Sequence, residues 1–291
     1  MSSNLPLPPA ALGRKSVGAD VLPDVVAKPL TLSERIWNRG EVRKGLLLIV
    51  LAGAWQAYAM HLDNALLFPT FVATVQALWD ALVTGGLLGK TWYSIQVLLV
   101  GYAIGLVLAA LLAMFAITTR LGTDLLETLT SMFNPLPAIA LLPLALIWFG
   151  LGNQSIVFVL VHSVLWAVAL NTHSGFMSVS TTLRMVGRNY GLTGLPYVTK
   201  ILIPAAFPSI LSGLKIGWAF AWRTLIAAEL VFGVSSGSGG LGWFIYENKN
   251  QLEIPSVFAG LFSVIVIGLI VENVIFRRIE IKTVRKWGMQ N

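Results

Sequence analysis

The chain has 291 residues, of which 56% are hydrophobic and only 11% are charged, and its mean hydropathy is +0.77. Such a small number of charged side chains cannot cover the surface of a water-soluble globular protein of this size. The composition therefore indicates a protein of the lipid bilayer. The net charge of +7 fits attraction to anionic lipid headgroups and requires no nucleic-acid partner, and the lack of cysteine excludes disulfides, thiolate metal sites and cysteine nucleophiles.

The chain begins with a polar segment, 1–44, that is rich in proline and precedes the first apolar run. We expect it to be cytoplasmic and partly disordered. Thr31-Leu-Ser-Glu34 has the pattern of a capping box, so 32–43 could form a short helix on the membrane surface, and a solvated tail is the open alternative. The apolar run comes too late, and lacks the small-residue cleavage site, for a signal peptide.

Six apolar runs follow, each close to the 20 or so residues, about 30 Å of helix, that cross a bilayer. They cover 45–62, 93–117, 135–152, 155–172, 205–232 and 255–276, and a basic tail, 277–291, follows them. The runs are continuously apolar rather than alternating, which favours helices over a β-barrel. We therefore expect an all-α membrane protein with one transmembrane domain over 45–276.

The distribution of basic residues predicts the orientation of these spans. Sixteen of the 20 Lys and Arg residues fall on the side that carries both termini, Arg120 and the loop 173–204, whereas the other side has Lys90 and Lys249. Because loops rich in Lys and Arg stay in the cytoplasm, both termini and the loop 173–204 are predicted to be cytoplasmic. The external loop, about 63–90, carries Val75, Leu78, Trp79 and Leu82 at helical spacing, which predicts an interfacial helix.

Two spans carry small residues at four-residue spacing, which lets another helix approach closely. They are Gly101, Gly105, Ala109 and Ala113 in the second span and Gly213 and Gly217 in the fifth. Packing within the bundle is the expected use, and a seam between two subunits is the alternative. The third span begins with Asn134-Pro-Leu-Pro137 and contains Pro143, so we expect it to be kinked or unwound.

The loop 173–204 contains residues that typically begin and end the helices of a helix–turn–helix. Ser180, Thr181 or Thr182 can cap its first helix, Gly191 can end that helix, and Gly194-Leu-Pro196 can begin the next. Gly187 and Gly191 would let a partner surface come near the backbone, and Arg188 and Lys200 add charge. An ordered basic loop in an apolar chain indicates a contact with another protein.

This loop resembles the EAA loop of permease subunits of bacterial ATP-binding-cassette (ABC) importers. The family pattern is Glu-Ala-Ala, three residues, Gly, nine residues, then Ile-x-Leu-Pro, and this chain keeps the spacing. The matching residues are Gly191, Ile201 and Pro204, whereas Ile203 replaces Leu and Met185-Val186-Gly187 replaces Glu-Ala-Ala. In the family the glutamate helps to hold the loop's shape or its ATPase contact, so here Arg184, Arg188 or Tyr190 would supply part of that contact.

The resemblance extends over about 45–287 and is greatest to permeases for nitrate, sulfonates, taurine or bicarbonate. Further matching stretches are Leu67–Thr70, Leu142–Gly152, Trp222–Glu229, Gly240–Gly242 and Arg285–Trp287. The resemblance implies a type I importer permease of the bacterial inner membrane, with a second permease subunit, typically identical, that completes one pathway for a small anion. It also implies an external substrate-binding protein and two cytoplasmic ATPase subunits.

The same resemblance implies that the chain is a transport subunit and not an enzyme. It would bind no cofactor, because ATP and Mg²⁺ belong to the partner ATPase. The sequence agrees with this, since Gly233–Gly242 is rich in glycine but lacks the Gly-Lys-Ser/Thr end of a phosphate-binding loop.

Lys215, Arg223 and Glu229 in the fifth span are the candidates for the pathway or its gate. Ionisable groups at bilayer depth are costly and usually face a pore, water or a polar partner. Arg223 could attract an anion, and pairing with another span is the alternative for each. His162 and His173 are isolated, and because metal sites need several ligands we expect packing roles and no metal site.

Two other classes of function fit the sequence less well. An ion- or proton-coupled secondary transporter could use Glu229 and Glu272 as coupling carboxylates, but the chain shows no convincing internal repeat. An intramembrane enzyme would need a nucleophile, an acid–base pair or a metal cluster on adjacent turns, and the sequence places none there.

Overall fold

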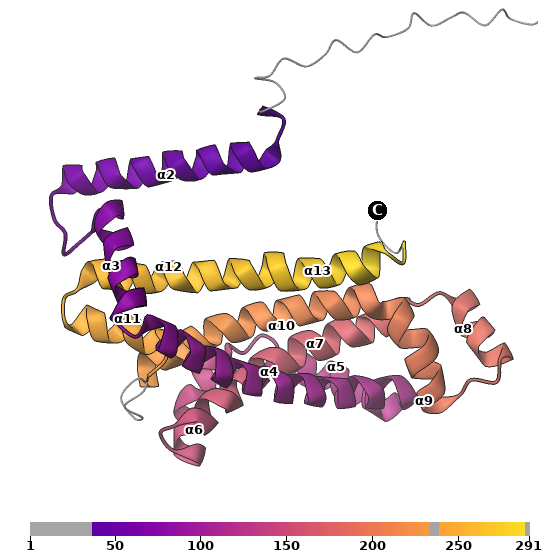
Figure 1. Cartoon of the computed structure of the whole chain (residues 1–291). Helices are drawn as coiled ribbons and strands as arrows, with labels where there is room; N and C mark the ends of the chain where they lie inside the picture. The colour runs from indigo at the N-terminus through magenta and orange to yellow at the C-terminus, as the bar shows by residue number, and fades with distance from the viewer. Residues whose placement is uncertain (1–36, 233–238, 289–291) are drawn as a thin grey trace, which may run out of the picture. The chain divides into compact units, whose positions relative to one another are not determined.

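Figure 1 shows the computed structural model, which describes residues 37–232 and 239–288. These residues are helical apart from short connections. The chain forms two structural units, Met1–Ala52 and Gly53–Asn291, and the boundary between them lies within the first described helix. The expected disorder and surface helix of the N-terminal segment concern mostly residues before 37, and most of the glycine-rich segment is 233–238, so these expectations lie outside the described residues.

The helices follow one another through most of the described chain. In order they are α2 (Gly40–Leu62), α3 (Phe71–Val83), α4 (Leu87–Thr118), α5 (Arg120–Phe133), α6 (Leu142–Phe149), α7 (Asn153–Ser178), α8 (Thr181–Asn189), α9 (Gly194–Tyr197), α10 (Ile203–Phe232), α11 (Leu241–Asn250), α12 (Ile254–Ile270) and α13 (Arg277–Glu280). Shorter 3₁₀ and π-helical segments are η1 (Ala138–Leu141), η2 (Val198–Leu202), η3 (Val271–Phe276) and η4 (Ile281–Arg285).

Five continuous helices in the described ranges are long and apolar enough to cross a membrane. They are Gly40–Leu62, Leu87–Thr118, Asn153–Ser178, Gly194–Val231 and Ile254–Arg285. A sixth crossing is possible if Arg120–Phe133 and Ala138–Phe149, which meet at an angle of 86°, form one broken span. The all-α membrane fold is therefore confirmed.

The third apolar run, 135–152, is interrupted at its prolines, as expected, and contains no single helix long enough to span the membrane. Its longest helix, α6, has eight residues, which extend only about 12 Å. Pro135 and Pro137 interrupt the backbone before it, because proline cannot donate the helical hydrogen bond. The helix α5 lies on the other side of this break, between the apolar runs 93–117 and 135–152, where no helix was predicted.

Other helices extend beyond the apolar runs that predicted them. The helix α4 begins at Leu87 rather than near 93, and α7 continues to Ser178. The last helix continues to Arg285, so most of the segment expected as a basic tail is helical. Gly86, the residue before α4, has φ of 66°, a backbone conformation that favours glycine.

The small residues of α4 and α10 pack against α7, which lies beside both helices (Figure 1). A Cβ atom on Gly101 would lie 2.6 Å from Leu160 Cβ, and one on Gly105 would lie 2.8 Å from Val164 Cβ. On α10, a Cβ atom on Gly213 would lie 2.8 Å from Asn171 Cβ. These residues therefore allow close packing within the chain, as expected, and the alternative of a seam between subunits is wrong for them.

The helix expected in the loop 63–90 is α3. Its N-cap is Thr70, whose hydroxyl accepts a hydrogen bond from the Ala73 amide at 3.2 Å. Leu78 and Leu82 pack against the main apolar core, while Trp79 is exposed.

Candidate functional site

The helix α8 has a defined start and end. At its start, the hydroxyl of Ser180 accepts a hydrogen bond from the Leu183 amide at 3.4 Å. At its end, Gly191 has φ of 72°, the Leu192 amide donates to the Gly187 carbonyl at 3.1 Å and the Gly191 amide donates to the Arg188 carbonyl at 2.9 Å. This is a Schellman motif, which favours glycine because of its positive φ. Ser180 is thus the cap, and Gly191 ends the helix as predicted.

Gly187 holds α8 close to the segment that leads into α10. It is buried, and a Cβ atom there would lie 2.9 Å from Ile201 Cγ1 and 3.0 Å from Tyr197 Cε2. A glycine at this position therefore allows the two segments to meet. Gly187 and Ile201, both candidates for a coupling role, contact each other and position the helix. Pro204, which directly follows the π-helical turn η2 and Ile203, is exposed.

Arg184 joins α8 to the end of α7. Its Nε donates to the Val179 carbonyl at 3.1 Å, and its Nη2 donates to the Phe176 carbonyl at 2.5 Å. The last carbonyls of a helix have no partner within it and carry partial negative charge, so a guanidinium there satisfies and stabilises them. The Arg184 side chain, expected as a possible docking contact, is therefore occupied within the chain.

The outer face of α8 carries exposed apolar side chains next to a basic one. Tyr190 is 82% exposed, Met185 57% and Val186 42%, and Arg188 is exposed beside them. Leu195, for which the sequence predicted no role, adds a further apolar side chain that is 64% exposed. We call Met185, Val186, Arg188, Tyr190 and Leu195 the α8 patch. A cluster of exposed apolar side chains is typical of a surface that binds a partner.

Lys215 forms an ion pair and also borders a second cavity, of about 370 Å³, between α10 and the last helix. Its Nζ is 2.6 Å from Glu280 Oε2, and Arg285 Nη2 lies 3.8 Å from the other oxygen of the same carboxylate. These contacts connect α10 to the last helix. The alternative of pairing with another span therefore holds for Lys215.

Glu229 is buried, with 3% of its surface exposed, and it binds two other segments. Its Oε1 accepts a hydrogen bond from the Ser94 hydroxyl at 2.7 Å, and its Oε2 accepts one from the Gly242 amide at 2.8 Å. Ser94 Oγ in turn accepts a hydrogen bond from the Leu241 amide at 2.8 Å. A Cβ atom on Gly240 would collide with the Glu229 carboxylate and the Ser94 hydroxyl, which explains the glycine there. Glu229 thus connects α4, α10 and α11.

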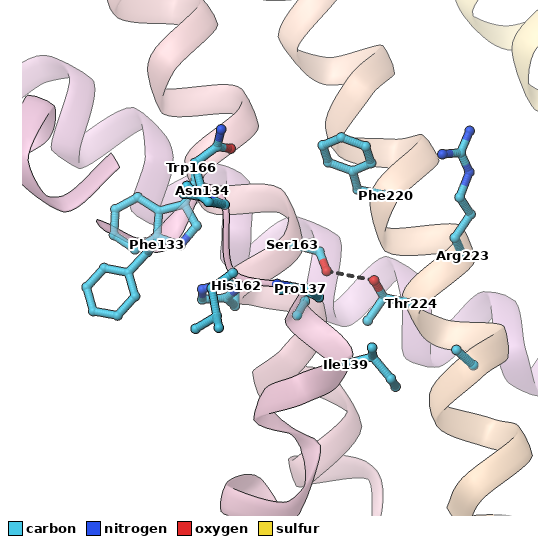
Figure 2. Close-up of a pocket in the computed structure, with 14 residues that line it drawn as sticks. Phe133, Asn134, Pro137, Ile139, His162, Ser163, Trp166, Phe220, Arg223 and Thr224 are labelled. Carbon is cyan, nitrogen blue, oxygen red and sulfur yellow. Dashed lines mark hydrogen bonds between the residues drawn. The ribbon is translucent and has the colours of Figure 1, made fainter. Parts of the chain in front are cut away.

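Arg223 differs from these two residues. It is exposed on α10, and no carboxylate in the described ranges lies within salt-bridge distance of it. It borders a cavity of about 360 Å³ between α7, α10 and the break at 134–139 (Figure 2). The Ser163 and Thr224 hydroxyls, 2.9 Å apart, connect α7 to α10 across this cavity.

Aromatic side chains form the α7 side of this cavity. The Trp166 and Phe133 rings are stacked, with centroids 5.3 Å apart and planes 12° apart, and His162 lies beside both. The buried Trp166 Nε1 and both ring nitrogens of His162 have no hydrogen-bond partner among the described residues. His162 borders the cavity, but its ring nitrogens are buried and do not open onto it. The prolines at 135 and 137 were the sequence signal for this break, whereas nothing in the sequence singled out Trp166.

Comparison with known proteins identifies the family. Residues 101–280, more than half of the chain, match the family described as "Binding-protein-dependent transport system inner membrane component". The chain belongs to this family of ABC transporter permeases. The permease is 31% identical over 246 residues to a putative ABC transporter permease protein, MJ0413, of Methanocaldococcus jannaschii, covering 83% of this chain and 91% of that protein.

Two further relatives have names that state a substrate. The permease is 28% identical over 246 residues to the putative aliphatic sulfonates transport permease protein SsuC of Bacillus subtilis, covering 84% of this chain and 87% of the relative. It is 27% identical over 247 residues to the nitrate import permease protein NrtB of Synechocystis, covering 82% and 88%.

The permease is therefore a multi-pass inner membrane subunit of an ABC importer, and it is not itself catalytic. Permeases of this family work with an ATPase and a binding protein. The family assignment sets aside the secondary transporter and the intramembrane enzyme. Within the described residues, no group of three or more His, Asp or Glu side chains could hold a metal ion.

Proposed function

We propose that the permease conducts a small anion into the cell and that the α8 patch docks on a cytoplasmic ATPase subunit. Relatives named for aliphatic sulfonates and for nitrate support an anion as the substrate. Arg223 at the cavity, with no carboxylate paired to it in the described ranges, supplies the positive charge that would attract one. The basic loops support a cytoplasmic location for α8.

The observation that carries this proposal is the connection of α8 to both cavity walls. Arg184 joins α8 to the end of α7, and Gly187 packs against Ile201 just before α10. The same two helices, α7 and α10, line the cavity. A push on the α8 patch would therefore move both walls together, because rigid helices transmit displacement along their length.

In the proposed cycle, ATP closes the ATPase pair, and the attached α8 helices turn the pathway outward to receive the anion from an external binding protein. Hydrolysis lets the pathway reopen inward. ATP and Mg²⁺ bind the ATPase. A second copy of the permease completes the pathway, and the position of Arg223 on an exposed face of α10 suits a pathway formed between two subunits.

Gly191→Pro tests the coupling role of α8. Proline requires a negative φ and has no N–H, so it cannot adopt the φ of 72° or donate to the Arg188 carbonyl. Gly288→Pro is the matched control, because Gly288 has φ of 68° and its amide donates to the Arg285 carbonyl at 3.1 Å. Both variants are reconstituted in proteoliposomes with the ATPase and the binding protein.

We expect Gly191→Pro to reduce ATP-driven uptake about tenfold or more, while the ATPase subunit loses stimulation by the loaded binding protein. Gly288→Pro should retain both activities. Normal uptake by Gly191→Pro, or an equal loss in the two variants, would contradict the coupling role of α8. Uptake driven by an ion gradient without ATP would contradict the whole proposal.

A further inference from the structure

The last helix is longer than the hydrocarbon core of a bilayer. It extends from Ile254 to Arg285, and its 32 residues span about 48 Å, whereas the hydrocarbon core is about 30 Å thick. The polar Glu253 directly precedes it, so its apolar part begins at Ile254 and has crossed about 30 Å of hydrocarbon near Val274. The residues after Val274 therefore lie at the depth of the headgroups, on the side that the basic loops place in the cytoplasm.

One row of exposed side chains on this helix changes from apolar to basic at that depth. The row has a spacing of four residues, and all of its members are exposed: Ile270, Val274, Arg278, Lys282 and Lys286. In an α-helix such a row drifts slowly around the axis, because a turn holds 3.6 residues. The wider π-helical turns η3 and η4 reduce this drift. We call these five residues the outer row.

The opposite face of the same stretch is fixed to α10. Phe276 and Val284 form a buried cluster with Leu211 of α10. Next to this cluster, the Glu280 carboxylate accepts a hydrogen bond from Lys215 Nζ at 2.6 Å. The outer row therefore belongs to an ordered helix that holds its cations at a fixed spacing. A signal that only sets the topology needs positive charge but no such order.

The basic part of the outer row is free of acidic partners in the described ranges. No carboxylate there lies within salt-bridge distance of Arg278, Lys282 or Lys286. The two acidic residues of this stretch face elsewhere: Glu280 pairs with Lys215, and Glu272 borders the cavity between α10 and the last helix. A cation near an anionic membrane surface strengthens binding about fivefold, so three together form a strong site for a phosphate group.

We propose that the outer row binds an anionic phospholipid of the cytoplasmic leaflet. Arg278, Lys282 and Lys286 bind the headgroup phosphate, and Ile270 and Val274 contact the acyl chains. The apolar half of the row favours a lipid over an acidic protein surface, because Ile270 lies within the hydrocarbon core, where a cytoplasmic protein does not reach. The bound lipid holds the end of the last helix and, through the contacts described above, the cytoplasmic half of α10. This site does not depend on which anion the permease transports.

A fluorescent label on the outer row tests this inference, because the chain has no cysteine of its own. Val274→Cys, where the native side chain is 40% exposed, carries the label. The permease, with a cysteine-free ATPase subunit, is placed in phosphatidylcholine nanodiscs that contain increasing fractions of brominated phosphatidylglycerol or brominated phosphatidylcholine. Bromine quenches the label only at short range, so quenching reports the lipid beside the row. We expect phosphatidylglycerol to reach half-maximal quenching at a fraction at least about fivefold lower.

The triple variant Arg278→Gln/Lys282→Gln/Lys286→Gln removes the charges of the site. All three side chains are exposed and form no ion pair in the described ranges, so the variant should fold. The two brominated lipids should then quench the label equally. The monodisperse fraction in size-exclusion chromatography confirms that the variant is folded.

A second triple variant, Arg39→Gln/Arg43→Gln/Lys44→Gln, is the matched control. It removes three exposed cations at the start of α2, on the same predicted side of the membrane. Because these residues lie outside the outer row, the control should keep the preference of the unchanged protein for phosphatidylglycerol.

Three results would overturn the inference. Equal quenching of the unchanged protein by the two lipids would show that the row does not select an anionic headgroup. A preference that survives the first triple variant, or that falls equally in both, would reflect the general charge of the protein. A preference that appears in the permease alone and disappears when the ATPase subunits bind would assign the basic surface to the ATPase.

Discussion

Glu229 shows how a single residue can change its interpretation once its neighbours are known. An acidic side chain in an apolar run is typical of an ion pathway, and the sequence makes Glu229 a pathway candidate with pairing to another span as the alternative. The structure surrounds its carboxylate with the Ser94 hydroxyl and the Gly242 amide, from two other segments. Its role in the fold is therefore to connect helices, and both glycines of Gly240-Leu-Gly242 serve that connection.

Glu229→Gln should destabilise the permease, because one neutral amide oxygen then has to accept from both the Gly242 amide and the Ser94 hydroxyl, which in the native protein lies within hydrogen-bond distance of both carboxylate oxygens. A hydrogen bond to a neutral acceptor contributes about 1 kcal/mol less than one to a charged acceptor, so about 1–2 kcal/mol should be lost and the thermal unfolding midpoint of the detergent-solubilised protein should fall. Uptake per folded molecule should stay at the level of the unchanged protein.

Glu247→Gln is the control for this change. Glu247 pairs with Lys90 at 2.6 Å, but its side chain is 37% exposed, so the loss should be at most about 1 kcal/mol. A stable Glu229→Gln variant that no longer transports would show that Glu229 belongs to the pathway after all.

At the scale of elements, the local signals in the sequence predicted α8 well. Ser180 caps and Gly191 ends the helix through contacts with neighbouring backbone, so the start and end of α8 could be predicted without knowledge of the rest of the fold. The role of Arg184 could not be predicted, because its partners are carbonyls exposed only where α7 ends. The prolines of the third apolar run predicted a break but not its 86° angle.

The helix α5 was missed for a different reason. It carries Arg120, Asp124 and Glu127 on a short amphipathic helix, so a search for continuous apolar runs passes over it. The cavity also could not be predicted from the sequence. Its walls come from three segments far apart in the chain, and only their packing shows that Trp166 and Arg223 border the same space.

The close packing of α4 on α7 gives a prediction at this scale. Gly105→Leu should reduce the yield of folded permease sharply, because even its Cβ atom would lie 2.8 Å from Val164 Cβ. Overpacking of this kind typically costs about 1–3 kcal/mol and more where backbones must separate. Gly89→Leu, in the same helix but with no atom within 4 Å of the added Cβ, should fold normally. The monodisperse fraction in size-exclusion chromatography measures both, and equal yields would contradict the packing.

For the whole molecule, one chain of contacts leads from the α8 patch to the cavity. Met185 replaces the glutamate of the family pattern and is exposed, so the proposed docking would depend more on apolar contact than on that charge. The inner contacts, made by Arg184 and Gly187, hold α8 to α7 and to the segment before α10. The permease thus combines a rigid attachment on one face of α8 with an open surface on the other.

Cross-linking tests this account most directly, and the chain suits it because it contains no cysteine. Tyr190→Cys on α8, where the native side chain is 82% exposed, and Trp79→Cys on α3, where it is 67% exposed, place single thiols at the two proposed faces of the membrane. With a short bismaleimide, Tyr190→Cys should form a covalent product with a cysteine on the ATPase subunit, and Trp79→Cys should form none. A product from Trp79→Cys, or none from Tyr190→Cys in an assembled complex, would contradict the docking of α8 on the ATPase.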